Sequence, residues 1–206
     1  MGGFGVKCIR KIILPAMALT VISPPSAMAH LVTSGLGPFY DGALHLVISP
    51  DDLLGLVAVT LLAGLCGAKA GRLAVIFLPF FWFAGGLAGL NLPVTMNLPW
   101  LSILSFLVLG VLVAIDPKLH PKIVATLAGL FGAIHGFLNG SALAIIGAGP
   151  LALSGIAVTV LVTSLLVSAF VVSLRATWTR IVVRVAGSWV AAVGMLMFGW
   201  MFRGTG

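Results

Sequence analysis

The sequence predicts an all-α, polytopic membrane protein, a bundle of about six transmembrane helices after a cleaved signal peptide. Of its 206 residues, 61% are hydrophobic and only 7% are charged, and the mean hydropathy is +1.25. A soluble globule of this size would need far more polar surface. The eleven Lys and Arg residues lie almost entirely between apolar runs. This spread is typical of loop charges in a membrane protein and excludes a nucleic-acid-binding patch.

The first 29 residues have the three parts of a secretory signal peptide. Three basic residues precede an apolar run over 12–22, and residues 26–29 form a small-x-small cleavage site. The apolar run contains Pro15 and is short against the roughly 20 residues of a bilayer span, so we predict cleavage rather than an uncleaved anchor. Cleavage would make His30 the new N-terminus, where its amine and imidazole could chelate a metal ion together. The alternative is that His30 is simply the residue that follows the cleavage site.

Residues 30–51 form a periplasmic or re-entrant segment that we expect to hold a metal site. The stretch 41–52 contains three of the four acidic residues of the chain and one of its four histidines. Such side chains are energetically costly to place near lipid, so their clustering indicates either a functional site or a structural role. Asp41 and His45 are four residues apart and share one face if 39–48 is a short helix or a re-entrant turn.

The acids that follow have two interpretations. Ser49 and Pro50 suit the N-cap and first positions of a helix, and Asp51 and Asp52 suit its first turn, with no metal involved. The same two carboxylates could instead be metal ligands. The capping interpretation explains the pair of acids but not the histidine six residues before Asp51.

Six apolar segments make up a transmembrane domain over 52–206. They cover 52–68, 73–90, 99–115, 123–146, 151–174 and 181–202, and their short connections favour a compact antiparallel bundle. Seven basic residues follow or flank the first, third and fifth segments, whereas the loops after the second and fourth hold no Lys or Arg. The seven are Lys69, Arg72, Lys118, Lys122, Arg175, Arg180 and Arg184. The positive-inside rule then predicts a cell inner membrane protein whose mature N-terminus is periplasmic.

The fourth segment carries two polar side chains on one helical face. His135 and Asn139 are four residues apart, and His135 lies about 20 Å from the inner start of the segment, in the outer half of the bilayer. Gly132, Gly136 and Gly140 recur at four-residue spacing, which lets helices approach closely in lipid. We therefore expect this helix to be central and tightly packed.

Together the polar residues form a set of nitrogen and oxygen donors. The candidate metal ligands are His45, Asp51, Asp52, His135, Asn139, His30 and Asp41. Imidazole and carboxylate suit a divalent first-row ion such as nickel, cobalt, copper, zinc or iron, held weakly enough to leave again. Cys8 and Cys66 offer no disulfide framework or cysteine metal motif. We expect no tightly bound cofactor.

Enzymatic activity is not expected. A hydrolase needs a nucleophile beside a base, and no Ser or Cys lies at helical spacing before His135, while Ser141 is off its face. No Walker A motif is present, so direct coupling to ATP is not indicated.

Two motifs that contain candidate metal ligands resemble those of the HupE/UreJ family. The motif His45-x5-Asp51-Asp52 precedes the first span, and His135-Gly-x-x-Asn139-Gly lies in the fourth. The resemblance implies a nickel or cobalt permease, with His45, Asp51 and His135 at the family's ligand positions. Asp52 and Asn139 stand where the family has histidine, and Ala142 stands where it has Glu. The alternative is a membrane accessory or scaffold protein that does not transport but meets a metalloenzyme maturation partner.

Overall fold

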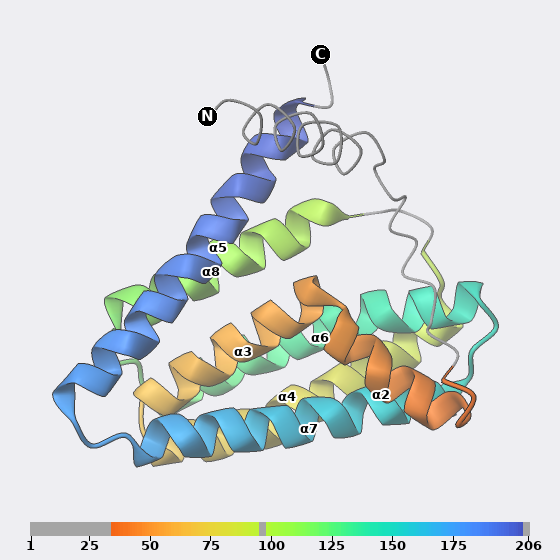
Figure 1. Ribbon diagram of the computed structural model, residues 1–206. Coiled ribbons are helices and arrows are strands. Elements are labelled where there is room, and N and C mark those ends of the chain that lie inside the picture. The colour runs from red at the N-terminus through yellow and green to blue at the C-terminus, as the bar shows by residue number, and fades with distance from the viewer. Residues whose placement is uncertain (1–33, 95–97, 204–206) are drawn as a thin grey trace, which may run out of the picture. The chain divides into compact units, whose positions relative to one another are not determined.

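The structure, a computed structural model, describes residues 34–94 and 98–203, and within these ranges it is helical with no strands. The helices are α2 (Pro38–Ile48), α3 (Pro50–Leu65), α4 (Ala68–Asn91), α5 (Pro99–Ile115), α6 (Pro121–Ile145), α7 (Pro150–Ser173) and α8 (Thr177–Arg203) (Figure 1). The predicted leader and His30 lie outside the described residues. The all-α class is confirmed.

Four helices, α4, α6, α7 and α8, are each long and apolar enough to cross a membrane. The pair α2 and α3 passes the same test only when taken together, with a bend of 74° between them. Helix α5 is apolar but shorter, at 17 residues. Helices α3 to α8 coincide with the six predicted segments, but the described residues give four or five spanning candidates by length and composition. The difference arises because α5, with 17 residues, falls below the length of a spanning candidate, and because α3, with 16 residues, needs α2 to complete a crossing.

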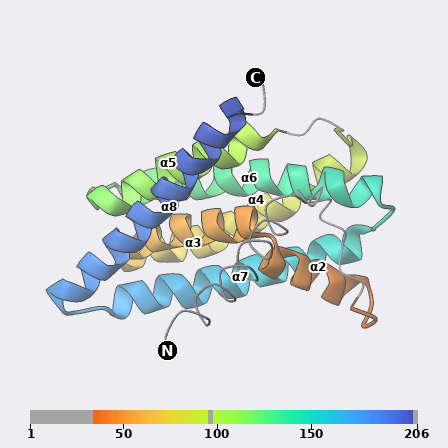
Figure 2. The ribbon, with the colours of Figure 1, turned by 45° about the horizontal axis from the view of Figure 1, so that its top comes forward.

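The break between α2 and α3 lies at Ser49 and Pro50. Ser49 has an extended backbone (φ −91°, ψ 95°) and its N–H donates to the carbonyl of His45 at 3.0 Å. Pro50 has no N–H to continue the first helix, but it suits the start of the second. Ser49 is the N-cap of α3 as predicted, although its side chain makes no capping hydrogen bond. The bend is visible where the two orange helices meet (Figure 2).

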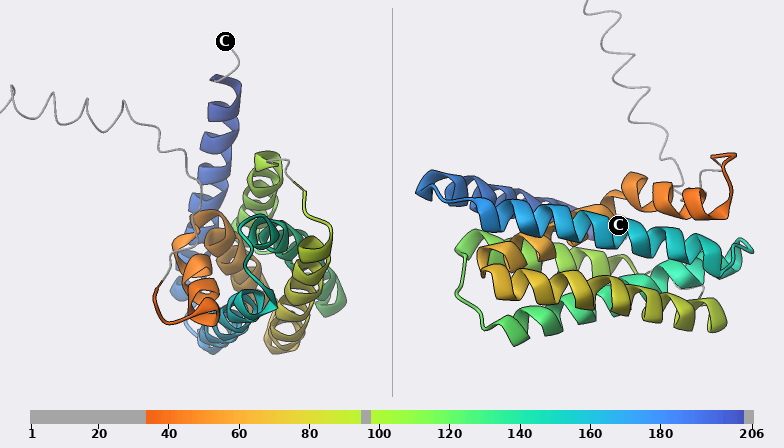
Figure 3. Two further views of the ribbon diagram at one scale, coloured as in Figure 1. Left: turned by 90° about the vertical axis from the view of Figure 1, so that its right-hand side faces the viewer. Right: turned by 90° about the horizontal axis from the view of Figure 1, so that it is seen from below.

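Helices α4 and α6 lie side by side (Figure 3), and glycine allows their close approach. A side chain at Gly136 would overlap the carbonyl of Trp82, and one at Gly140 would overlap the carbonyl of Gly86. Buried residues make up 56% of the most apolar stretch of α6, against 28–33% in the other three long helices. The predicted central position of the fourth segment follows from this small-residue contact.

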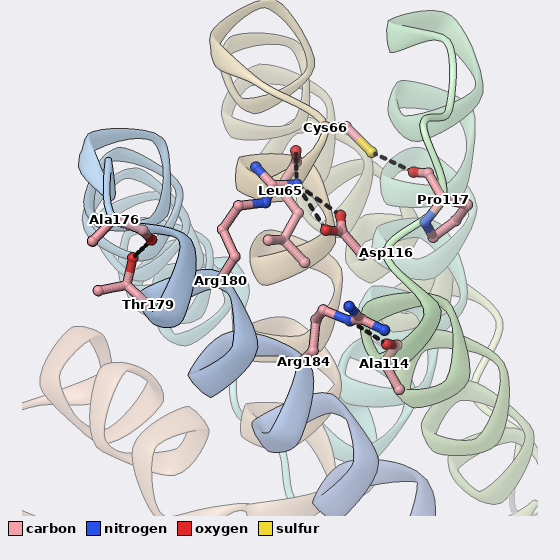
Figure 4. Close-up of polar contacts among 9 residues, drawn as sticks. All are labelled: Leu65, Cys66, Ala114, Asp116, Pro117, Ala176, Thr179, Arg180 and Arg184. Carbon is pink, nitrogen blue, oxygen red and sulfur yellow. Dashed lines mark hydrogen bonds and ion pairs between the residues drawn. The ribbon is translucent and has the colours of Figure 1, made fainter.

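The end of the bundle that carries the basic loops is joined by polar contacts (Figure 4). Arg180, at the start of α8, donates to both carboxylate oxygens of Asp116 at 2.9 and 2.8 Å and to the carbonyl of Leu65 at 3.2 Å. Asp116 ends α5 in the left-handed conformation (φ 51°). Arg180 therefore ties the first turn of α8 to the last residues of α3 and α5.

A thiol lies beside this junction. Cys66, between α3 and α4, donates from Sγ to the carbonyl of Pro117 at 3.5 Å (Figure 4). Burial raises the pKa of the Cys66 thiol above its ordinary value, because the thiolate is poorly solvated there.

Candidate functional site

The centre of the site is a polar contact between α3 and α6. Asp52, in the first turn of α3, places Oδ1 2.8 Å from Nδ1 of His135 in α6. Asn139, one turn further along α6, donates from Nδ2 to Oδ2 of Asp52 at 2.7 Å. The three residues are 5%, 1% and 6% exposed. Both oxygens of the carboxylate are thus engaged inside the bundle, away from solvent.

The other ring nitrogen of His135 faces a third helix. Ser105 in α5 places Oγ 3.2 Å from Nε2 of His135. Phe131 stacks on the imidazole with 4.1 Å between ring centroids, and Trp82 of α4 lies 6.0 Å away. Hydrogen bonds at both nitrogens and a ring on one face fix the orientation of the imidazole.

Sequence reasoning missed Ser105. It lies on another helix, so no spacing within the fourth segment could reveal it. The order Ser105, His135, Asp52 resembles a hydrolase relay, but Oγ of Ser105 also donates to the carbonyl of Leu101 at 2.8 Å. A hydroxyl has one proton, so its bond to the backbone competes with transfer to the imidazole.

Asp41 and His45 share the buried face of α2 that their spacing predicts. Asp41 accepts hydrogen bonds from the backbone N–H and the hydroxyl of Ser34, both at 2.6 Å. His45 is 7% exposed, and its Nδ1 has no hydrogen-bond partner. The close crossing of α2 and α7 sets this face, because a side chain at Gly42 would overlap the carbonyl of Ala152.

The two acids at the start of α3 have different surroundings. Asp51 is exposed, whereas Asp52 is buried against His135. An exposed acid in a first turn is what the capping interpretation requires. The capping interpretation does not account for Asp52, because side chains of α6 contact both of its carboxylate oxygens.

Two unpartnered polar atoms belong to candidate ligands. They are Nδ1 of His45 and Oδ1 of Asn139, and both are fully buried. Unsatisfied buried polar atoms are uncommon and call for an explanation, such as an ion or a water. Among residues 34–94 and 98–203, no three His, Cys, Asp or Glu side chains lie together as a metal-binding group. The structure thus joins Asp52, His135 and Asn139, while Asp41 and His45 lie on α2.

Comparison with known proteins identifies one family. The protein-family model described as HupE / UreJ protein matches residues 17–197 of the chain. Searches of curated proteins and of solved structures gave no match. The family is associated with nickel or cobalt transport, or with an accessory role for metalloenzymes, and is not known as catalytic.

Proposed function

The chain belongs to the HupE/UreJ family, and on that premise we propose that it is a membrane permease for a divalent transition metal ion. The ion would be nickel or cobalt by family association, taken up from the periplasmic side. It is the cargo of the protein, and no tightly bound cofactor is proposed.

One observation carries the proposal: a carboxylate, an imidazole and an amide meet inside an apolar bundle. Asp52 and His135 are 2.8 Å apart and nearly inaccessible. Such groups are energetically costly to place within a membrane, so their presence there indicates a function. The pair and Asn139 offer one nitrogen and up to three oxygens to an ion that replaces their mutual hydrogen bonds. The unpartnered Oδ1 of Asn139 is free to bind without breaking any contact.

The outer residues would receive the ion first. Asp41, His45 and Asp51 belong to the segment that the positive-inside rule places outside, with His30 at the predicted mature N-terminus. Nδ1 of His45 is buried and has no hydrogen-bond partner, so an ion that reached it would displace no existing bond. A cation moving inward gains about 2.3 kcal/mol per elementary charge per 100 mV of membrane potential. Weak, successive sites suit this movement, because each must also release the ion.

The donor set has fewer nitrogens than the family motif implies. Carboxylate and amide at positions 52 and 139 make the site harder than two further imidazoles would. Copper, zinc and iron therefore join nickel and cobalt as ions to test.

A second candidate is a membrane accessory protein that holds a metalloenzyme maturation partner and does not transport. The absence of a group of three metal-binding His, Cys, Asp or Glu side chains among the described residues favours it. It predicts a copurifying protein partner and unchanged metal content in cells.

The deciding experiment is metal analysis of cells expressing the protein, across nickel, cobalt, copper, zinc and iron. His135→Ala and His45→Ala should each lower the accumulated metal to the level in cells that do not express the protein. His120→Ala is the matched control, because His120 is exposed in the loop before α6 and should not affect accumulation. If the double variant His45→Ala, His135→Ala accumulates as much metal as the unmodified protein, the permease is excluded.

A further inference from the structure

We propose that a groove between α4 and α7, at the basic end of the bundle, is a binding site for one anionic phospholipid of the adjacent leaflet. This site is separate from Asp52 and His135 and does not depend on the transport function.

The groove has a volume of about 350 Å³. It lies between the first turns of α4, from Ala68 to Ile76, and the last turns of α7, from Leu165 to Val172. Apart from Arg72 and Ser168, its lining residues are apolar or glycine. Ser168 directs its hydroxyl to the carbonyl of Thr60 at 3.4 Å, so it is already engaged. The walls therefore suit an acyl chain, not a polar ligand.

At this point the space between the two helices would admit one more carbon atom at ordinary van der Waals distance. A side chain carbon at Gly71 would lie 3.6 Å from Cβ of Ser168 and 3.7 Å from Cγ2 of Val172. Arg72 is adjacent to Gly71 and lines the groove. Val172 lies beside Gly71, and Arg175 follows Val172 within one turn just past the end of α7. Arg72 thus places a positive charge on the groove, and Arg175 adds one to the loop that follows α7.

These charges have no carboxylate to neutralise them. Of the four acidic residues, Asp41, Asp51 and Asp52 belong to α2 and to the opposite end of α3, and Asp116 is bound by Arg180. Arg72 and Lys69 are exposed and form no ion pair among the described residues. Long basic side chains extend from apolar surface toward lipid headgroups, and basic pockets between helices bind anionic headgroups. Charge complementarity therefore selects an anionic phospholipid over a zwitterionic one.

The test uses the full protein in vesicles of equal phosphatidylglycerol and phosphatidylcholine with identical acyl chains. After mild detergent extraction, native mass spectrometry counts the lipids that remain bound. We expect bound phosphatidylglycerol to exceed phosphatidylcholine by about fivefold for each basic side chain involved. Arg72→Gln should lower this ratio by about fivefold, and Arg203→Gln, which removes the same charge from the far end of α8, should leave it unchanged.

A second variant tests the groove itself. Ala169→Leu places a larger side chain in the groove from an exposed position of α7, and it should reduce the number of retained lipids without lowering thermal stability. Ala186→Leu, at an exposed position of α8, is the matched control. The proposal is overturned if both lipids are retained equally, if Arg72→Gln and Arg203→Gln change the ratio alike, or if Ala169→Leu retains as much lipid as Ala186→Leu.

Discussion

Oδ1 of Asp52 lies 2.8 Å from Nδ1 of His135, although 83 residues separate the two in the chain. The contact joins the first turn of α3 to the middle of α6, and no spacing within one helix predicts it. Asn139 occupies the other carboxylate oxygen at 2.7 Å. The pair and the amide therefore act as one polar unit between two helices.

The first prediction concerns the strength of this unit. Asp52→Ala and His135→Ala should each lower the free energy of unfolding by about 3–5 kcal/mol, because each leaves the other partner buried alone. The double variant should lose less than the sum, with a coupling energy of about 1–3 kcal/mol. Denaturant unfolding in mixed micelles measures these values.

The same cycle on Asp116 and Arg180 provides the comparison. That pair lies at the surface, with the Arg180 side chain 44% exposed, and we expect a coupling energy below about 1 kcal/mol. Equal coupling in the two cycles would show that burial does not strengthen the Asp52–His135 contact.

The second prediction concerns metal selectivity. Asn139→His and Asp52→His restore the residues that the resemblance to the family implies. Added imidazole nitrogen should shift accumulation toward nickel and cobalt and away from ions that prefer oxygen donors, such as manganese. Metal analysis of expressing cells in a medium containing equal concentrations of these ions measures the shift. A nickel to manganese ratio that does not change in either variant would argue against these positions as ligands.

The third prediction concerns the α4–α6 contact. Gly136→Ala and Gly140→Ala should each destabilise the protein by about 1–3 kcal/mol, because the added carbon overlaps a backbone carbonyl of α4 that cannot move alone. Gly199→Ala is the matched control, since a carbon added there in α8 meets nothing within 4 Å. Thermal unfolding in detergent reports the difference, and equal melting temperatures for all three variants would contradict close packing.

The fourth prediction uses Cys66 to report on the basic end of the bundle. In a Cys8→Ser background, maleimide should label Cys66 more slowly than an introduced Thr177→Cys control at the exposed start of α8. The raised pKa of Cys66 leaves less thiolate at neutral pH. Its labelling rate should therefore keep rising with pH after that of the control has levelled.

Weakening the contact between Arg180 and Asp116 should change the labelling rate of Cys66. Asp116→Asn removes the charge that holds Arg180, so α8 should separate more readily from α3 and α5. Labelling of Cys66 should then accelerate, while labelling of the Thr177→Cys control stays the same. An unchanged Cys66 rate would mean that the Arg180 contact does not restrain this end.

Much of the fold follows from local composition. Apolar runs and short basic loops predict the helices from α3 to α8, because the membrane requires each segment to satisfy its own backbone. Ser49 and Pro50 predict the start of α3 in the same way, since a helix terminus depends on neighbouring residues. Whether a helix crosses the membrane alone depends on its neighbours as well, because α3 is long enough to span only together with α2.

The sequence by itself determined that the chain is a polytopic helical membrane protein, and it predicted three of the four acids on the same side as a histidine of the fourth segment. It also identified His135 and Asn139 as one face of a helix, because a helix fixes which neighbours share a face. Only the tertiary structure decided that Asp52, not Asp51, meets that face, and that Ser105 completes it. Contacts between helices depend on how the glycines of α4 and α6 and the bend at Ser49 place whole helices, and no spacing within one helix carries that information.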